Sequence, residues 1–201
     1  MTGLFIVFEG GEGSGKSTQA AALAQRIGAL LTRQPGGTAL GGALRELLLD
    51  PANHHMAPKT EALLMAADRA QHEAELIGPT LEAGTHVVCD RYIGSSIAYQ
   101  GVGRNLGVDE IERISMWAVH ERVPDVVVLL DVSEATAMSR LDRPLDRVEL
   151  AGPEFHEAIR AAYRRLAAND DRWVSVDGNS DIATVQERVW NEVVARCGDR
   201  L

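Results

Sequence analysis

The chain has 201 residues and a formal net charge of −9 at pH 7, with an isoelectric point near 5.1. This length suits one domain, and the acidic balance argues against a general nucleic-acid-binding protein, which needs concentrated Lys and Arg. Cys89 and Cys197 have neither the spacing nor the company of a metal site. Because the first predicted strand follows Met1 almost at once and the longest apolar run, 126–130, is far too short for a bilayer, we expect a cytoplasmic protein without signal peptide or membrane span.

The first predicted unit is a strand, a glycine-rich loop and a helix. Residues 4–8 are an apolar run typical of a buried parallel strand. Residues 10–17 then match the phosphate-binding pattern G-x-x-x-x-G-K-[S/T], and residues 17–27 have helix-forming composition. Glycines let backbone N–H groups converge on phosphate oxygens, and the helix points its positive end at the same place. A chance match in a flexible glycine turn is the alternative, and the flanking strand and helix argue against it.

Strands and helices alternate along the rest of the chain. Further strands are predicted at 29–33, 86–90, 126–130 and 173–176. Further helices are predicted at 40–49, 60–77 (with an interruption at Pro79), 108–122, 134–141, 154–168 and 182–196. Residues 93–107 carry only a short helical patch near 95–99. This alternation predicts an α/β fold of the P-loop NTPase type, a five-stranded parallel sheet with helices on both faces, in one domain that spans 1–201.

Arginines gather at predicted turns and strand ends. They are Arg33, Arg45, Arg69, Arg91, Arg140, Arg143 and Arg147. Guanidinium groups bind phosphate bidentately, and a division into one group before position 92 and one after 139 suggests two anionic substrates, as in a kinase of nucleoside monophosphates. A surface salt bridge is the simpler reading of any isolated arginine, but Arg91 directly follows Asp90 at the end of a buried strand, where open parallel sheets bind ligands. Asp90 either serves Mg²⁺, directly or through water, or only caps the following turn.

Four collinear motifs resemble those of bacterial thymidylate kinases. They read FEGGEGSGKSTQ at 8–19, TRQPGGT at 32–38, AADRAQH at 66–72 and DRYIGSSIAYQG at 90–101. The resemblance covers essentially the whole chain, and the last motif is specific to this kinase among phosphate-loop proteins. It implies a nucleoside monophosphate kinase-like fold, phosphorylation of dTMP to dTDP by ATP, Mg²⁺ as cofactor and a homodimer.

On the donor side, the resemblance assigns the whole phosphate loop to ATP. The implied ATP-binding residues are Gly10, Gly11, Glu12, Gly13, Ser14, Gly15, Lys16, Ser17 and Thr18. Lys16 would reach the β- and γ-phosphates, and Ser17 and Asp90 would serve Mg²⁺. Glu12 would contact the sugar of the acceptor or its metal-bound water.

On the acceptor side, the resemblance implies one residue set. The implied dTMP-binding residues are Gln34, Pro35, Arg45, Met65, Arg69, Arg91, Ser96, Tyr99 and Gln100. Arg45 and Arg91 would hold the phosphate, and Arg69 would donate to a thymine carbonyl. Tyr99 would pack against the sugar where a 2′-hydroxyl would clash, and the other residues would surround the base.

The loop lacks an arginine, so the resemblance is to the branch whose catalytic arginine comes from a lid, here about 141–153. Candidates besides Arg91 are Arg140, Arg143 and Arg147, and Arg147 within DRVE fits the family pattern best. Arginine fingers are worth about 10³–10⁵ in rate.

The sequence departs from the family pattern in three places. Gln34 stands where an acid is usual, so only hydrogen bonding survives there. Met65 replaces a phenylalanine that stacks on thymine, which predicts weaker or less selective base binding. The lid also looks a few residues shorter than usual, which leaves the choice of catalytic arginine open.

Two other functions remain alternatives at this point. One is a kinase for another pyrimidine nucleotide or deoxynucleoside, and the other is a catalytically silent nucleotide-binding regulator. The intact Lys16, Ser17, Asp90 and Arg91 argue against the silent protein.

Overall fold

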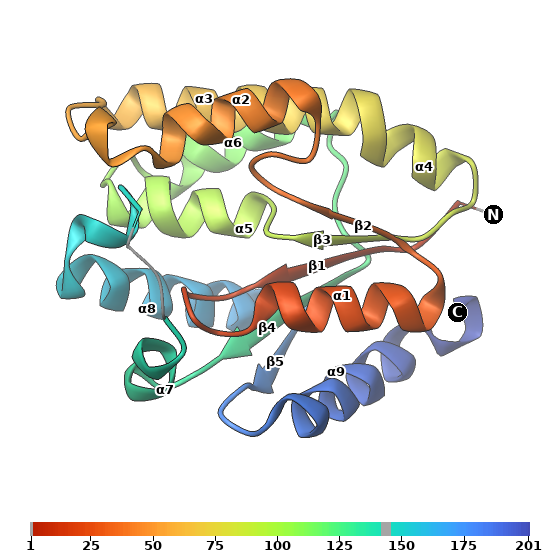
Figure 1. Cartoon of the computed structure of the whole chain (residues 1–201). Coiled ribbons are helices and arrows are strands. Elements are labelled where there is room, and N and C mark those ends of the chain that lie inside the picture. Colours follow the sequence, from red (N-terminus) through yellow and green to blue (C-terminus); the bar gives the residue numbers. More distant parts are fainter. Residues whose placement is uncertain (1, 142–145) are drawn as a thin grey trace.

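A five-stranded, entirely parallel sheet forms the centre of the molecule (Figure 1). The computed structural model describes residues 2–141 and 146–201. The strands are β1 (Phe5–Glu9), β2 (Leu30–Arg33), β3 (Val87–Asp90), β4 (Val126–Asp131) and β5 (Trp173–Asp177), in the order β2-β3-β1-β4-β5. The predicted fold class is confirmed.

Helices cover both faces of this sheet (Figure 1). They are α1 (Lys16–Ile27), α2 (Ala39–Leu49), α3 (Pro58–His72), α4 (Gly78–Glu82), α5 (Ile93–Ser96), α6 (Val108–Ala118), α7 (Glu134–Ser139), α8 (Pro153–Asn169) and α9 (Ile182–Cys197). Short 3₁₀ turns stand at Pro51–Asn53, Glu149–Ala151 and Gly198–Arg200. Among the described residues, no helix is long and apolar enough to cross a membrane.

The strand β1 shows why its sequence is a continuous apolar run. Ile6 and Phe8 point to the face covered by α1 and α9, whereas Phe5 and Val7 point to the face covered by α3, α5 and α6. A strand buried on both faces cannot alternate apolar with polar residues, because each face needs apolar side chains.

Two segments are more helical than their sequences predicted. The 93–107 stretch forms α5 and then a π-helical segment, Ile97–Gly103, although it is rich in glycine and serine. The long helix predicted at 60–77 is α3 followed by a second π-helical segment, Glu73–Ile77, and Pro79 lies in the first turn of α4. The helix α6 ends earlier than predicted, at Ala118, where His120 and Glu121 follow with positive φ.

The carboxyl ends of three neighbouring strands reach the same edge. Asp90 is in register with Phe8 on β1 and with Arg33 on β2. The phosphate loop, the 34–38 turn and α5 follow directly from these strand ends, so the chain brings its predicted functional residues to one edge of the sheet.

Candidate active site

The phosphate loop lies between β1 and α1, as its pattern predicts. Gly10, Gly13 and Gly15 have φ values of 143°, 69° and 91°, which favour glycine. A Cβ on Gly13 would also lie 2.3 Å from the carbonyl oxygen of Ala137 on α7. Both conformation and space therefore require glycine there.

The amine of Lys16 is held inside the loop. Its Nζ donates to the carbonyl oxygen of Gly11 at 2.7 Å and lies 3.3 Å from the Ser14 hydroxyl oxygen. Burial, together with the nearby charge of Arg91, lowers the pKa of Lys16 to about 8. A bound polyphosphate would oppose this shift by supplying negative charge.

Ser17 and Asp90 meet at the start of α1. The Ser17 hydroxyl donates to Asp90 Oδ2 at 2.5 Å, and Asp90 Oδ1 is buried without a hydrogen-bond partner among residues 2–141 and 146–201. Two hard oxygen ligands beside a phosphate loop suit Mg²⁺, which keeps several waters and binds substrate phosphates. Within the described parts of the chain, no cluster of three or more His, Cys, Asp or Glu side chains could hold a metal alone.

All the residues predicted to bind the acceptor line one pocket. Its walls include Gln34, Pro35, Arg45, Met65, Arg69, Arg91, Ser96, Tyr99 and Gln100. Glu12 of the phosphate loop also lines this pocket, so the two predicted substrate sites adjoin.

Arg69 lies at the buried end of the pocket. Its Nε donates to Gln34 Oε1 at 3.0 Å, its Nη1 to the Ser115 hydroxyl at 3.1 Å and its Nη2 to the Ser96 hydroxyl at 3.0 Å. The side-chain amide of Gln34 also meets His72 Nδ1 at 3.0 Å. Burial lowers the pKa of Arg69, and its contacts fix the plane of the guanidinium.

Arg45 lies at another wall of the same pocket. Its Nη1 donates to the carbonyl oxygen of Pro35 at 3.0 Å. Gly36, with φ 103°, makes room for this side chain, because a Cβ there would lie 2.9 Å from Arg45 Cδ. Burial and the neighbouring charges of Arg33 and Arg91 lower the pKa of Arg45, so an anion bound here would relieve a repulsion between guanidinium groups.

Arg91 joins the two predicted sites. It follows β3 with φ 72°, a left-handed conformation that is uncommon outside glycine. Its Nη1 donates to the carbonyl oxygen of Gly10 at 3.0 Å, and its Nη2 forms an ion pair with Glu12. The Tyr99 hydroxyl donates to the same Glu12 carboxylate at 3.1 Å.

Of the lid candidates, Arg140 and Arg147 lie in the described residues, and they contact different parts of the protein. Arg140 donates from Nη2 to the carbonyl oxygen of Gly178 at 2.9 Å and lies beside Gly15 of the loop. Arg147 is buried, with Nε donating to the carbonyl oxygen of Leu48 at 2.7 Å and Nη2 2.8 Å from Glu61 Oε2. Arg143 lies outside the described residues.

Glu61 is a buried carboxylate whose contacts the sequence did not reveal. Besides its ion pair with Arg147, it accepts hydrogen bonds from Gln100 Nε2 at 2.8 Å and from Arg104 Nε at 3.3 Å. Burial would raise the pKa of this carboxyl, but these hydrogen bonds and charges lower it. Glu61 therefore links a predicted base-binding residue to a predicted catalytic arginine.

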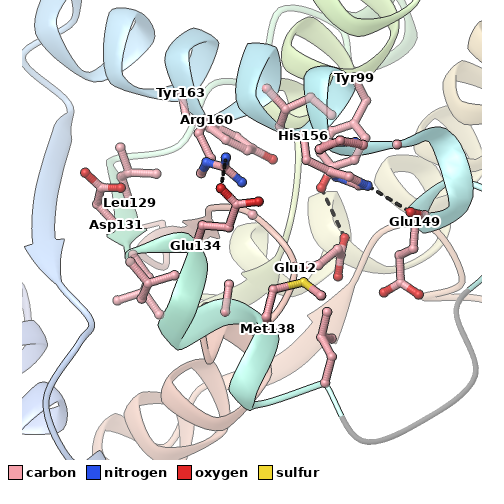
Figure 2. A pocket seen from close by; sticks show the side chains of 18 residues that line it. Glu12, Tyr99, Leu129, Asp131, Glu134, Met138, Glu149, His156, Arg160 and Tyr163 are labelled. Carbon is pink, nitrogen blue, oxygen red and sulfur yellow. Dashed lines mark hydrogen bonds and ion pairs between the residues drawn. The ribbon is translucent and has the colours of Figure 1, made fainter.

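A further cavity of about 250 Å³ opens between α7, α8 and the phosphate loop (Figure 2). Arg160 of α8 meets Glu134 of α7 across it at 3.3 Å, while Tyr99 meets Glu12 elsewhere on its wall (Figure 2). Arg160 and Tyr163 carry no motif signal, because α8 reads only as an amphipathic helix. Their helical spacing placed both on one face, but only the fold shows what that face meets.

The fold and the site define a class of protein. A phosphate loop at the carboxyl edge of a parallel sheet, joined through Glu12 and Arg91 to a second, arginine-lined pocket, is the arrangement of a P-loop kinase acting on a small phosphorylated substrate.

Comparison with known proteins identifies the family. The thymidylate kinase family model matches residues 8–189. The chain is 45% identical to the thymidylate kinase of Leifsonia xyli over 195 residues, which cover 93% of this chain and 92% of the relative. It is 46% identical to that of Bifidobacterium longum subsp. infantis, with 97% and 86% covered. A crystal structure of thymidylate kinase from Ehrlichia chaffeensis superposes with a TM-score of 0.80 at 28% identity, covering 96% of this chain and all of that one. The chain belongs to the thymidylate kinase family, and the predicted family and enzyme class are confirmed.

Proposed function

We propose that this chain transfers the γ-phosphoryl group of ATP to dTMP in the adjoining pockets described above, giving dTDP and ADP. One observation carries this assignment to the site: the pocket lined by all the predicted acceptor residues shares Glu12 with the phosphate loop. The enzyme must hold two polyanions in line and exclude water, and the ion pair between Arg91 and Glu12 lies where the two would meet.

The donor would bind with its phosphates in the loop. Lys16 would exchange its contacts with Gly11 and Ser14 for phosphate oxygens. Ser17 and Asp90 would hold Mg²⁺, which would neutralise negative charge on the donor phosphates when bound. Arg140, beside Gly15 and Gly178, would face the donor rather than the acceptor.

The acceptor would bind with thymine at Arg69 and its phosphate at Arg45 and Arg91. A guanidinium fork offers donors that suit a pyrimidine carbonyl, and buried polar groups left unpaired by the wrong base would disfavour it. Met65 would pack its thioether on the face of the base.

Arg147 remains our proposed catalytic arginine of the lid. In its present position it is bound to Glu61, so it would have to leave that carboxylate to reach the transferring group. Arg91 would act from the acceptor side throughout.

A coupled ADP-release assay with a panel of monophosphates tests this function. We expect turnover with dTMP to exceed that with dUMP, dCMP and purine monophosphates, and Arg69→Ala to raise the KM for dTMP.

The base-binding wall is tested separately by Met65→Phe. This variant should lower the KM for dTMP, because an aromatic ring restores stacking on the base. A higher KM in this variant would place the base elsewhere, and ATP turnover independent of dTMP would overturn the proposal.

We also propose a homodimer, a cytoplasmic location, and a single domain with a short lid at about 141–153.

The dimer would use the helices α2, α3 and α6. They pack side by side and carry exposed large apolar side chains, among them Leu47, Leu63 and Trp117. Trp117 is 79% exposed. Light scattering of the wild type and of Leu63→Glu would test association, and a monomeric wild type would contradict it.

The two cysteines support the proposed location. The buried Cys89 and Cys197 are both free, which suits a reducing compartment.

A further inference from the structure

Glu9 is a buried carboxylate beneath the proposed catalytic centre. It is the last residue of β1 and is 0% exposed. Neither the loop pattern, which begins at Gly10, nor the proposed reaction gives it a role. Its contacts nevertheless lead to Arg91.

The two carboxylate oxygens have different partners. Oε1 accepts from the backbone N–H groups of Tyr92 and Ser95, each at 2.9 Å. Oε2 accepts from the Ser95 hydroxyl at 2.6 Å and from the Tyr163 hydroxyl at 3.2 Å. Both hydroxyl oxygens also accept hydrogen bonds from Arg91 Nη1, at 3.2 Å for Ser95 and 3.1 Å for Tyr163.

These contacts limit the directions of the hydrogen bonds. A carboxylate only accepts, so the Ser95 hydroxyl donates to Oε2, while the Tyr163 hydroxyl donates either to Oε2 at 3.2 Å or to the Ser95 hydroxyl oxygen at 2.8 Å. The lone pairs of both oxygens then face Arg91, whose guanidinium only donates. The guanidinium is thereby aimed at the carbonyl oxygen of Gly10, the first residue of the phosphate loop.

The same carboxylate holds the backbone around Arg91. Its bonds to Tyr92 and Ser95 close the turn in which Arg91 takes its positive φ. Gly94 leaves the space for this approach, since a Cβ there would lie 2.9 Å from Glu9 Oε1.

We propose that Glu9 is a positioning residue for phosphoryl transfer, which aims the Arg91 guanidinium through the hydroxyls of Ser95 and Tyr163. The inference rests on the proposed role of Arg91 at the acceptor phosphate. It assigns Glu9 no contact with either substrate. A misdirected guanidinium would stabilise the transition state poorly while the remaining contacts still hold dTMP.

Glu9→Gln tests this role with little change in shape. Its amide nitrogen would donate toward Ser95 and Tyr163 and reverse the bonds that now face Arg91. We expect kcat to fall about 10- to 100-fold, the range typical for loss of a residue that orients a metal ligand, with the Kd for dTMP changed less than about threefold. Glu73→Gln is the matched control, because Glu73 is also buried but pairs with Arg122 outside the site. Its kcat should stay near wild type at a comparable loss of Tm.

Ser95→Ala with Tyr163→Phe provides a second test that leaves the carboxylate and its backbone bonds in place. This double variant should reproduce the loss of kcat, and adding Glu9→Gln to it should cause little further loss. An unchanged kcat in Glu9→Gln, or a fully additive loss in the combined variant, would overturn the inference. A different result would contradict the proposed function itself, namely wild-type turnover with dTMP in Arg91→Ala.

Discussion

At the scale of single residues, the buried amine of Lys16 makes donor binding depend on pH. Its pKa is about 8 because of burial and the charge of Arg91, so the amine loses its proton as the pH rises through 8. We expect kcat/KM for ATP to fall above this pH, while kcat at saturating ATP falls less, because bound phosphate favours the charged form. The pKa of the Cys89 thiol is raised well above its usual value by burial, so that thiol does not titrate in the same range.

Steady-state kinetics from pH 7 to 9.5 measure this effect. Lys16→Arg is the control, because arginine stays charged throughout, so its weaker activity should show a flatter profile. A flat wild-type profile for kcat/KM would mean that the amine is already stabilised in its charged form before ATP binds.

The lid arginine gives a second prediction at this scale. Arg147→Ala should lower kcat by about 10³-fold or more, as for other arginines that stabilise a transferring phosphoryl group, with little change in the Kd for dTMP. Arg104→Ala is the matched control, since Arg104 also binds Glu61 but stacks on Phe155 instead of belonging to the lid. If Arg147→Ala turned over normally, the role would pass to Arg140 or Arg143.

Which site residues could be predicted depends on how far apart their partners lie in the chain. Arg45, Arg69 and Arg91 lie in or beside sequence motifs, and the fold brings them to one pocket. Glu9 and Tyr163 could not be paired from the sequence, because 154 residues separate them. The contact between Arg147 and Glu61 was missed for the same reason, since no local pattern marks Glu61 and the DRVE pattern around Arg147 does not reveal its partner.

At the scale of elements, strands were easier to predict than helices. The strand β4 was expected at 126–130 and is Val126–Asp131, because burial on both faces leaves a clear apolar run. The π-helical segment Ile97–Gly103 was predicted only in its first residues, within the helical patch expected near 95–99, since its glycine-rich sequence has weak helix propensity. Buried Ile97, Ala98 and Tyr99 show that packing, rather than propensity, holds it.

The turn between β2 and α2 offers a prediction at this scale. Gly36→Ala should raise the KM for dTMP, because the new Cβ would lie 2.9 Å from Arg45 Cδ. It should also destabilise the fold by about 1–3 kcal/mol, the usual cost of a strained positive φ.

Gly42→Ala is the control for this turn. Gly42 lies in α2 with nothing within 4 Å of an added Cβ, so alanine should stabilise the helix by about 0.5–1 kcal/mol. Urea unfolding and the KM for dTMP separate the two variants. Equal effects on KM would show that Gly36 does not position Arg45.

At the scale of the whole molecule, an acidic protein gathers three arginines in one pocket. The net charge is −9, yet Arg45, Arg69 and Arg91 line a single pocket. The charge of Arg69 also acts on His72, which is 0% exposed and forms hydrogen bonds with Thr32 and Gln34. Burial and the charge of Arg69 lower the pKa of His72 to about 4.

Global stability should therefore fall as the solution becomes mildly acidic. The unfolded chain takes up a proton on this histidine near pH 6.5, whereas the folded chain does so only near pH 4. Between these pH values, protonation therefore stabilises the unfolded state relative to the folded state. At pH 5 the linked loss of unfolding free energy relative to pH 7 is about 2 kcal/mol. Burial raises the pKa of Asp68 and of Glu73, which acts in the opposite direction, so the wild type must be compared with a variant. Urea unfolding at pH 7 and pH 5 should show a smaller drop for His72→Gln than for the wild type, and equal drops would mean that His72 is protonated in the folded protein.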